Sequence, residues 1–131
     1  MKNIVIDTSS IIAVILAEPE KEKLVGLTKN ANLLAPASLH WEIGNAFSAM
    51  FKKKRISLND AIAAIDIYEN IPIQFIDIEL KNALELAHGS NIYAYDAYMI
   101  ICALSYKAPL LTLDDVLIRI AREYKIKILE V

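Results

Sequence analysis

The chain of 131 residues contains little glycine and cysteine and has no long apolar segment. Its three glycines, Gly26, Gly44 and Gly89, form neither a dinucleotide-binding fingerprint nor a P-loop, which argues against nucleotide binding through either motif. A single cysteine excludes an intramolecular disulfide and is typical of a reducing compartment, so we expect a cytoplasmic protein. The longest apolar run, residues 97–104, is too short to cross a bilayer, and we expect no membrane partner.

The chain also has no large excess of positive or negative charge. Lysine and arginine number 14 against 16 aspartates and glutamates, a formal net charge of −2. No overall basic field therefore attracts nucleic acid. A carboxylate cluster that binds divalent cations would nevertheless lower the formal charge while presenting a positive site once loaded, so nucleic acid is not excluded. Asp7 lies where a signal peptide needs its apolar core, and we expect no export signal.

Apolar residues, in contrast, make up 56% of the chain beside 23% charged residues, which is typical of a globular protein. Strand-like and helix-like segments alternate with short connections, which predicts an α/β fold with a parallel sheet between helices. We expect one domain over residues 1–131. The predicted strands are 3–6, 33–36, 72–76, 109–112 and 126–130, and the predicted helices are 8–17, 20–29, 38–54, 58–69, 78–88, 94–106 and 115–124.

Residues typical of helix ends support these boundaries. Ser38 and Ser57 are placed to cap the helices that follow them, and Asp60 follows Ser57 at the spacing of a capping box. Gly89 is expected at the position just after a helix. Gly44 lies inside a predicted helix at a cost of about 1 kcal/mol relative to alanine, which suggests close approach of another backbone.

Four acidic residues lie where the predicted strands end or the predicted helices begin: Asp7, Glu42, Asp96 and Asp114. In an open α/β sheet, ligands bind beyond the carboxyl ends of the strands. Carboxylates gathered there repel one another unless some are protonated or a cation lies between them. The cation suited to an all-oxygen site is Mg²⁺ or Mn²⁺.

Three of these acids also have a structural interpretation. Asp7 and Asp114 are each placed to cap the helix that follows, and Asp115 competes with Asp114 for the second cap. Glu42 and Asn45 are three residues apart and share one helix face. The pattern around them leaves open whether that face is exposed to solvent or turned toward a site.

Asp96 requires a positive neighbour. The helix that it opens is apolar on all sides and is predicted to be buried. The helix dipole stabilises a carboxylate by only about 1 kcal/mol, whereas burial of an unpaired carboxylate costs several kcal/mol. A structural arginine is the alternative to a metal, but the chain has only Arg55, Arg119 and Arg122, and two of these lie on the last predicted helix. A metal is the favoured interpretation.

Two further clusters have both a structural and a functional interpretation. Lys52–Arg55 closes a predicted helix, where cations are favoured in any protein; contact with an RNA backbone or an acidic partner is the alternative. Tyr93, Tyr95 and Tyr98 flank Asp96, and most of them are expected to pack, with stacking of one on a nucleic-acid base as the alternative.

These motifs resemble those of the PIN-domain ribonucleases, and most closely the small VapC-type toxins of prokaryotic toxin–antitoxin pairs. The resemblance runs from end to end of the chain and implies a five-stranded parallel sheet of order 3-2-1-4-5, flanked by about seven helices. The segments that carry it are Ile6-Asp7-Thr8-Ser9, Glu42-Ile43-Gly44-Asn45, Tyr95-Asp96-Ala97 and Leu111-Thr112-Leu113-Asp114.

The resemblance also implies a function. It implies a Mg²⁺- or Mn²⁺-dependent endoribonuclease that acts on RNA, forms a homodimer and binds an antitoxin whose basic C-terminal segment covers an acidic groove. Asp115 is an alternative to Asp114 as the fourth acid. The residues implied in metal ligation and catalysis are Asp7, Glu42, Asp96 and Asp114, and those implied as polar support are Ser9, Asn45 and Thr112.

Other classes of protein share parts of this pattern. A phosphate-accepting receiver domain pairs acids after its first strand, and an Asp-x-Asp phosphatase carries a second aspartate, whereas here Asp7 is followed by Thr8 and Ser9. A non-catalytic module whose acidic groove docks a basic partner tail would keep all four acids. Metal-dependent turnover distinguishes this module from the nuclease.

Overall fold

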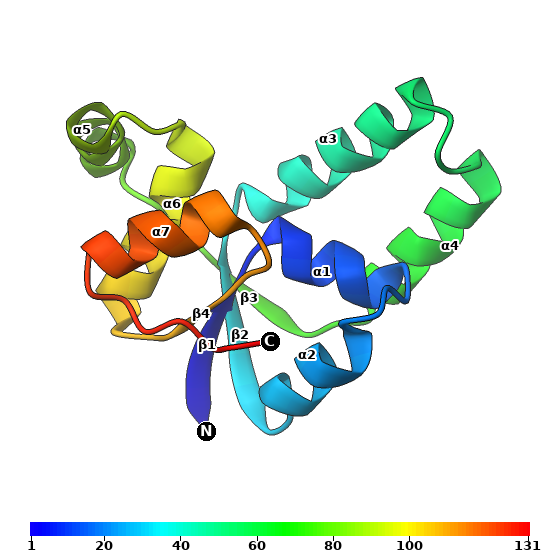
Figure 1. The fold of residues 1–131 in the computed structure, drawn as a ribbon, viewed down its shortest axis with the longest axis horizontal. Helices are drawn as coiled ribbons and strands as arrows, with labels where there is room; N and C mark the ends of the chain where they lie inside the picture. Colours follow the sequence, from blue (N-terminus) through cyan, green and yellow to red (C-terminus); the bar gives the residue numbers. More distant parts are fainter.

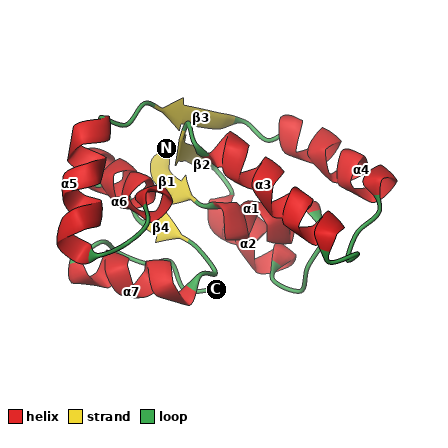
Figure 2. Ribbon diagram, turned by 90° about the horizontal axis from the view of Figure 1, so that it is seen from above, coloured by secondary structure: helices red, strands yellow, loops and turns green.

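Parallel strands form a sheet at the centre of the protein, in the order β3-β2-β1-β4 (Figures 1 and 2). The computed structural model describes residues 1–131. Within the sheet, Val5 pairs with Leu34 on one side and with Leu110 on the other, so β1 is a central strand. The strands are β1 (Lys2–Ile6), β2 (Ala31–Pro36), β3 (Ile73–Ile76) and β4 (Leu110–Leu111).

Helices cover both faces of this sheet, as the alternating pattern predicts. One group of helices lies on one side of the sheet and a second group on the other (Figure 2). All seven predicted helices are present, with ends within two residues of the predicted ones, and none is long and apolar enough to cross a membrane. The first group is α1 (Thr8–Ile15), α2 (Lys21–Thr28), α3 (Leu39–Lys52) and α4 (Leu58–Glu69); the second is α5 (Leu80–Ser90), α6 (Ala94–Tyr106) and α7 (Asp115–Glu123).

The prediction of a fifth strand at residues 126–130 was wrong. This segment makes only one isolated bridge, between Leu110 and Ile128. Its partner β4 is two residues long, because Thr112 already turns its hydroxyl toward the amide of Asp114 at the start of α7. A strand this short offers no continuous ladder to a neighbour, so the sheet has four strands in the order 3-2-1-4.

Three predictions about helix ends and interiors were also wrong. Gly89 lies within α5, and Asn91 takes the left-handed position after the helix, with φ 54°. Asparagine tolerates this conformation because its short polar side chain can bond locally. A Cβ atom on Gly44 would meet nothing within 4 Å, so no backbone approaches it. Ser38 has a helical backbone, and its hydroxyl donates to Glu42 instead of capping α3.

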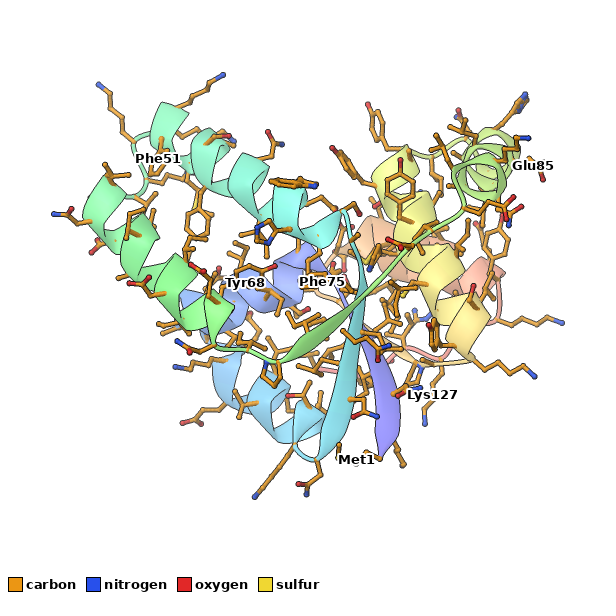
Figure 3. All side chains as sticks on the ribbon, turned by 180° about the vertical axis from the view of Figure 1, so that it is seen from behind. Met1, Phe51, Tyr68, Phe75, Glu85 and Lys127 are labelled. Carbon is orange, nitrogen blue, oxygen red and sulfur yellow. The ribbon has the colours of Figure 1, made fainter.

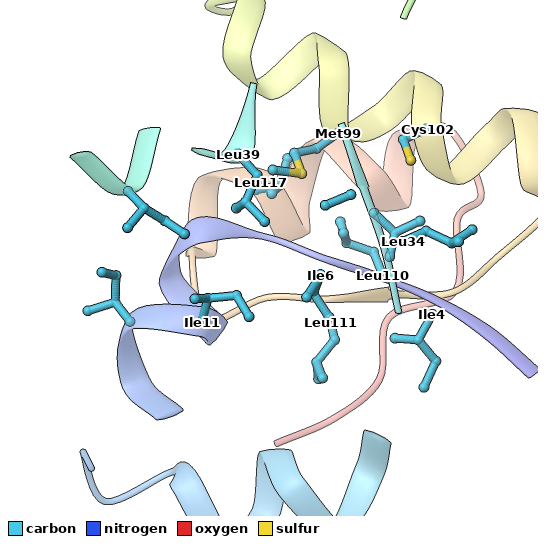
Figure 4. Packing of buried hydrophobic residues seen from close by; sticks show 14 of the residues in the cluster. Ile4, Ile6, Ile11, Leu34, Leu39, Met99, Cys102, Leu110, Leu111 and Leu117 are labelled. Carbon is cyan, nitrogen blue, oxygen red and sulfur yellow. The ribbon is translucent and has the colours of Figure 1, made fainter. Parts of the chain in front are cut away.

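The core joins the buried faces of the sheet to both groups of helices. Ile4, Val5 and Ile6 of β1 are at most 4% exposed, which fits a central strand covered on both sides. Met99 of α6 and Leu117 of α7 pack into the same core (Figure 4). The core therefore fixes both helices against the carboxyl end of β1.

Helices α3 and α4 form an arm that extends from the sheet (Figures 1 and 3). Phe51 lies at its far end, and Tyr68 lies at the end near the sheet (Figure 3). Ser57 caps α4 as predicted, with its hydroxyl accepting from the Asp60 amide at 3.1 Å. At the base of the arm, His40 Nδ1 and the Tyr68 hydroxyl are 3.1 Å apart and share a hydrogen bond. This bond joins the start of α3 to the end of α4.

Candidate active site

A pocket of about 420 Å³ lies beyond the carboxyl ends of β1 and β4. All four acids predicted from the sequence line it, although they are up to 107 positions apart in the chain. No lysine, arginine or histidine lines this pocket. Its polar lining consists of Asp7, Thr8, Ser9, Glu18, Glu42, Asp96 and Asp114.

Asp7 is both a helix cap and the deepest acid of the pocket. Its Oδ1 atom accepts from the amide and the hydroxyl of Ser10, each at 3.0 Å, and these bonds start α1. Ser9 and Thr112 donate their hydroxyls to the same carboxylate. The side chain is 5% exposed, and burial raises the pKa of the Asp7 carboxyl above its usual range despite these four donors. Asp7 therefore caps α1 and lines the pocket with the same carboxylate.

The two loops that carry Asp7 and Asp114 are tied to each other by hydroxyl groups. Thr112 donates to Asp7 Oδ2 at 2.5 Å and accepts from the Asp114 amide at 3.0 Å. Ser9 Oγ accepts from the Leu113 amide at 2.9 Å. Thr112 is buried, so its bonds are shielded from water. This network fixes the end of β1 against the end of β4.

Glu42 faces the pocket rather than open solvent. Burial raises the pKa of its carboxyl to about 7, and the charges of Asp7 and Asp96 add to the rise. The Ser38 hydroxyl donates to Glu42 Oε2 at 3.1 Å, and this hydrogen bond offsets part of the rise in pKa. Asn45 is exposed and does not line the pocket, so the helix face shared by Glu42 and Asn45 is only partly turned toward the site.

Asp96 and Asp114 complete the acidic wall in different ways. Asp96 is half-buried in the first turn of α6, and burial raises the pKa of its carboxyl, with smaller contributions from the charges of Asp114 and Asp7. Asp114 is exposed and caps α7, where its Oδ1 accepts from the amides of Val116 and Leu117. Asp115 is not part of the pocket lining, so the structure places Asp114 there.

Sequence reasoning missed two polar residues of the pocket. Glu18 lies in the turn after α1, away from any strand end, and no local pattern marks it. Thr8 follows Asp7, and its hydroxyl is the only buried side-chain polar atom without a hydrogen-bond partner. An apolar wall formed by Ile12, Met50 and Met99 adjoins these groups.

The donor atoms fit a hydrated divalent cation, although no three of the acids are arranged to hold one ion directly. The pocket offers carboxylate and hydroxyl oxygens, which are the ligands that Mg²⁺ and Mn²⁺ prefer. Three of its acids have raised pKa values, and no side-chain cation lines the pocket to balance them. Because Mg²⁺ usually keeps several of its waters, acids too far apart for direct ligation can still bind it through water.

The fold and this pocket agree with comparisons to known proteins. The chain resembles PAE2754 from Pyrobaculum aerophilum, with 18% identity, a TM-score of 0.72, and coverage of 92% of this chain and 81% of that one. It also resembles a chain of VapBC2 from Rickettsia felis, whose crystal structure holds a DNA fragment from their promoter. The identity there is 20%, the TM-score 0.66, and the coverage 98% of this chain and 97% of that one.

At these identities the two similarities show a shared fold. A search of curated proteins gave no significant match. The family model described as the PIN domain matches residues 4–123, which is most of the chain. The protein therefore belongs to the PIN domain family.

Proposed function

We propose that this protein is a Mg²⁺- or Mn²⁺-dependent endoribonuclease and the toxin of a toxin–antitoxin pair. The observation that carries the proposal is the pocket at the carboxyl ends of the strands, lined by five carboxylates and no cationic side chain. Membership of the PIN domain family supports a nuclease. Burial of uncompensated acids is unfavourable, so a bound cation would relieve a cost that the folded protein otherwise carries.

Asp7 and Asp96 are proposed as the principal ligands of the cation. Asp114 would hold a second or weaker ion, and Glu42 would act as a ligand or as the base that orients water. When bound, a divalent cation supplies neutralisation of the anionic phosphodiester and Lewis acidity. In-line attack of water on phosphorus would form the new P–O bond, break the bond to the 3′ oxygen and leave a 5′-phosphate.

The protein's own groups contribute position and proton transfer. In the metal-free protein burial raises the pKa of the Glu42 carboxyl to about 7. A bound cation would lower this pKa and keep Glu42 ionised, so that the carboxylate could orient water and accept its proton. Ser9 and Thr112 hold the Asp7 carboxylate in one orientation, because both donate to it while the loop after β4 fixes them in turn. Preorganised groups of this kind require little rearrangement during the reaction. Asn45 would assist only as a contact outside the pocket.

An antitoxin and a second copy of the chain are the proposed partners. The similarity to a chain of VapBC2 supports an antitoxin. We expect its C-terminal segment to be basic, and disordered until it binds the acidic pocket. A homodimer is proposed from the resemblance of the sequence motifs to VapC-type toxins, and Trp41, 71% exposed, and Tyr93, 84% exposed, are candidates for the contact.

One observation favours a second candidate, a non-catalytic module that docks a basic tail. The acids are not arranged to close on one metal ion. A groove that docks a basic tail needs negative charge, but its acids need not converge on one ion. Complex formation does not separate the two candidates, since a toxin would also bind its antitoxin, whereas turnover does.

Cleavage of a labelled structured RNA by the purified protein tests the proposal, with Mg²⁺ or Mn²⁺ compared with EDTA. Asp96→Asn should abolish cleavage, because it removes a charge from the pocket. Asp115→Asn is the matched control: it removes the same charge from an exposed neighbour of Asp114 outside the pocket. Cleavage that persists in EDTA or in Asp96→Asn would contradict the assignment, and metal-dependent cleavage would exclude the docking module.

A further inference from the structure

Four consecutive cations, Lys52–Arg55, form the end of the α3–α4 arm, and this segment is called the basic tip below. All four side chains are exposed. None of them pairs with an acid, because the only salt bridge of the protein joins Arg122 and Glu130. The tip projects from the rest of the molecule beside Phe51 (Figure 3). It is a concentrated positive surface on a chain whose net charge is −2.

The pocket extends along α3 toward this tip. Glu42, Ala46 and Met50 line the pocket and follow one another at intervals of four residues, so they form one stripe on the helix. Lys53 and Lys54 follow this stripe directly at the end of the helix, where Lys53 is the C-terminal cap residue. The rise from Glu42 to Lys53 is about 17 Å along the axis. The acidic pocket and the basic tip therefore lie near the two ends of α3.

Stabilisation of the helix end does not account for the whole basic tip. Cations near a helix C-terminus contribute about 0.3–1 kcal/mol, and the effect is confined to the last turn. Helix α3 ends at Lys52, and Lys54 has a left-handed backbone with φ 54°, so Lys54 and Arg55 lie outside that turn. Adjacent like charges without acidic partners also repel one another. An anionic ligand would relieve this repulsion.

We propose that the basic tip binds the phosphate backbone of single-stranded RNA while the scissile bond lies in the acidic pocket. This inference rests on the proposed nuclease function. Without a bound cation the five carboxylates of the pocket repel a polyanion, and a bound cation neutralises only the phosphate at the scissile bond, so binding of the rest of the strand requires cations elsewhere. The rise of about 17 Å from Glu42 to Lys53 corresponds to roughly five stacked nucleotides at 3.4 Å each. The substrate thus lies along α3 with one end anchored on the basic tip.

The test compares the wild-type protein with Lys53→Gln/Lys54→Gln on a trinucleotide and on a twelve-nucleotide single-stranded RNA. The matched control is Lys125→Gln/Lys127→Gln, which removes two exposed lysines after α7, one of them also left-handed with φ 59°. Lys127 and Phe51 lie at opposite sides of the molecule (Figure 3). The readouts are kcat, KM and the dependence of kcat/KM on salt.

A plot of log kcat/KM against log salt has a negative slope. On the long RNA, loss of two phosphate contacts should make this slope less negative by about 1.4. This corresponds to a loss of up to about 25-fold in 0.1 M salt, expressed in KM with kcat unchanged. The trinucleotide, which is too short to reach the tip, should be cleaved as fast by the variant as by the wild type.

Two results would overturn the inference. One is a variant that matches the control on the long RNA, which would leave the basic tip for contact with an acidic protein. The other is an equal loss on both substrates, which would indicate a general effect on the pocket. A wild-type protein that cleaves neither RNA with metal present would instead contradict the proposed function itself.

Discussion

Replacement of Glu42 by glutamine should make the metal-free protein more stable above neutral pH. Folding raises the pKa of this carboxyl from 4.5 to about 7, mainly through burial and further through the charges of Asp7 and Asp96. The folded state therefore holds the proton more tightly than the unfolded chain does. The stability that this group contributes is complete below about pH 4.5 and is lost as pH rises through about 7.

The size of the effect follows from the same two values. A rise from 4.5 to about 7 corresponds to at most about 3 kcal/mol. Glu42 is only half-buried, so solvent screens the penalty, and about 1–2 kcal/mol is expected. Glutamine keeps the shape and can still accept the Ser38 hydroxyl, but it carries no charge at any pH.

Urea unfolding in EDTA at pH 5 and pH 8 measures this difference. The wild-type protein should lose about 1–2 kcal/mol more than Glu42→Gln between the two pH values. Asp7 and Asp96, whose pKa values are also raised, remain in both proteins, so the difference reports Glu42 together with its repulsion of these two charges. Mg²⁺ at pH 8 should restore more stability to the wild type than to the variant. Parallel pH profiles of the two proteins would refute the reasoning.

Three further outcomes follow from the contacts. Thr112→Val should cost about 1–3 kcal/mol in urea unfolding and reduce cleavage, because it removes one of the four donors to the buried Asp7 carboxylate and leaves the Asp114 amide without its hydroxyl acceptor; unchanged stability would contradict this. Ser57→Ala should cost about 1 kcal/mol through loss of a helix cap with kcat unchanged, and a change in kcat would show that α4 affects the site. The Cys102 thiol is buried and its pKa is raised to about 12, so it should react with a thiol reagent only on unfolding.

The acids at the ends of strands were predictable because local signals mark them. Asp7 and Asp114 each follow an apolar strand and precede a helix, and such positions suit both a cap and a ligand. The sequence posed these as alternatives, but the structure shows that one carboxylate serves as a cap and lines the pocket. Asp96 was identified because its helix is too apolar to hold an unpaired charge.

Features that depend on distant parts of the chain were not predictable. Glu18 reaches the pocket because the turn after α1 happens to lie beside α3, and no residue near it in sequence indicates this. The hydroxyl of Ser10 donates to the Leu111 carbonyl, a contact across 101 positions. The expected fifth strand failed for the same reason, since its pairing depends on how long β4 remains extended, and Thr112 decides that by bonding into the site.

Binding of Mn²⁺ to the purified protein, followed by electron paramagnetic resonance, tests the central claim most directly because it requires no knowledge of the RNA. The proteins to compare are the wild type, Asp96→Asn and the control Asp115→Asn. We expect the wild type and Asp115→Asn to bind Mn²⁺ with similar affinity, and Asp96→Asn to bind it at least tenfold more weakly, about 1.4 kcal/mol. Equal affinity in all three proteins, or no binding to the wild type, would contradict a metal site formed by these carboxylates.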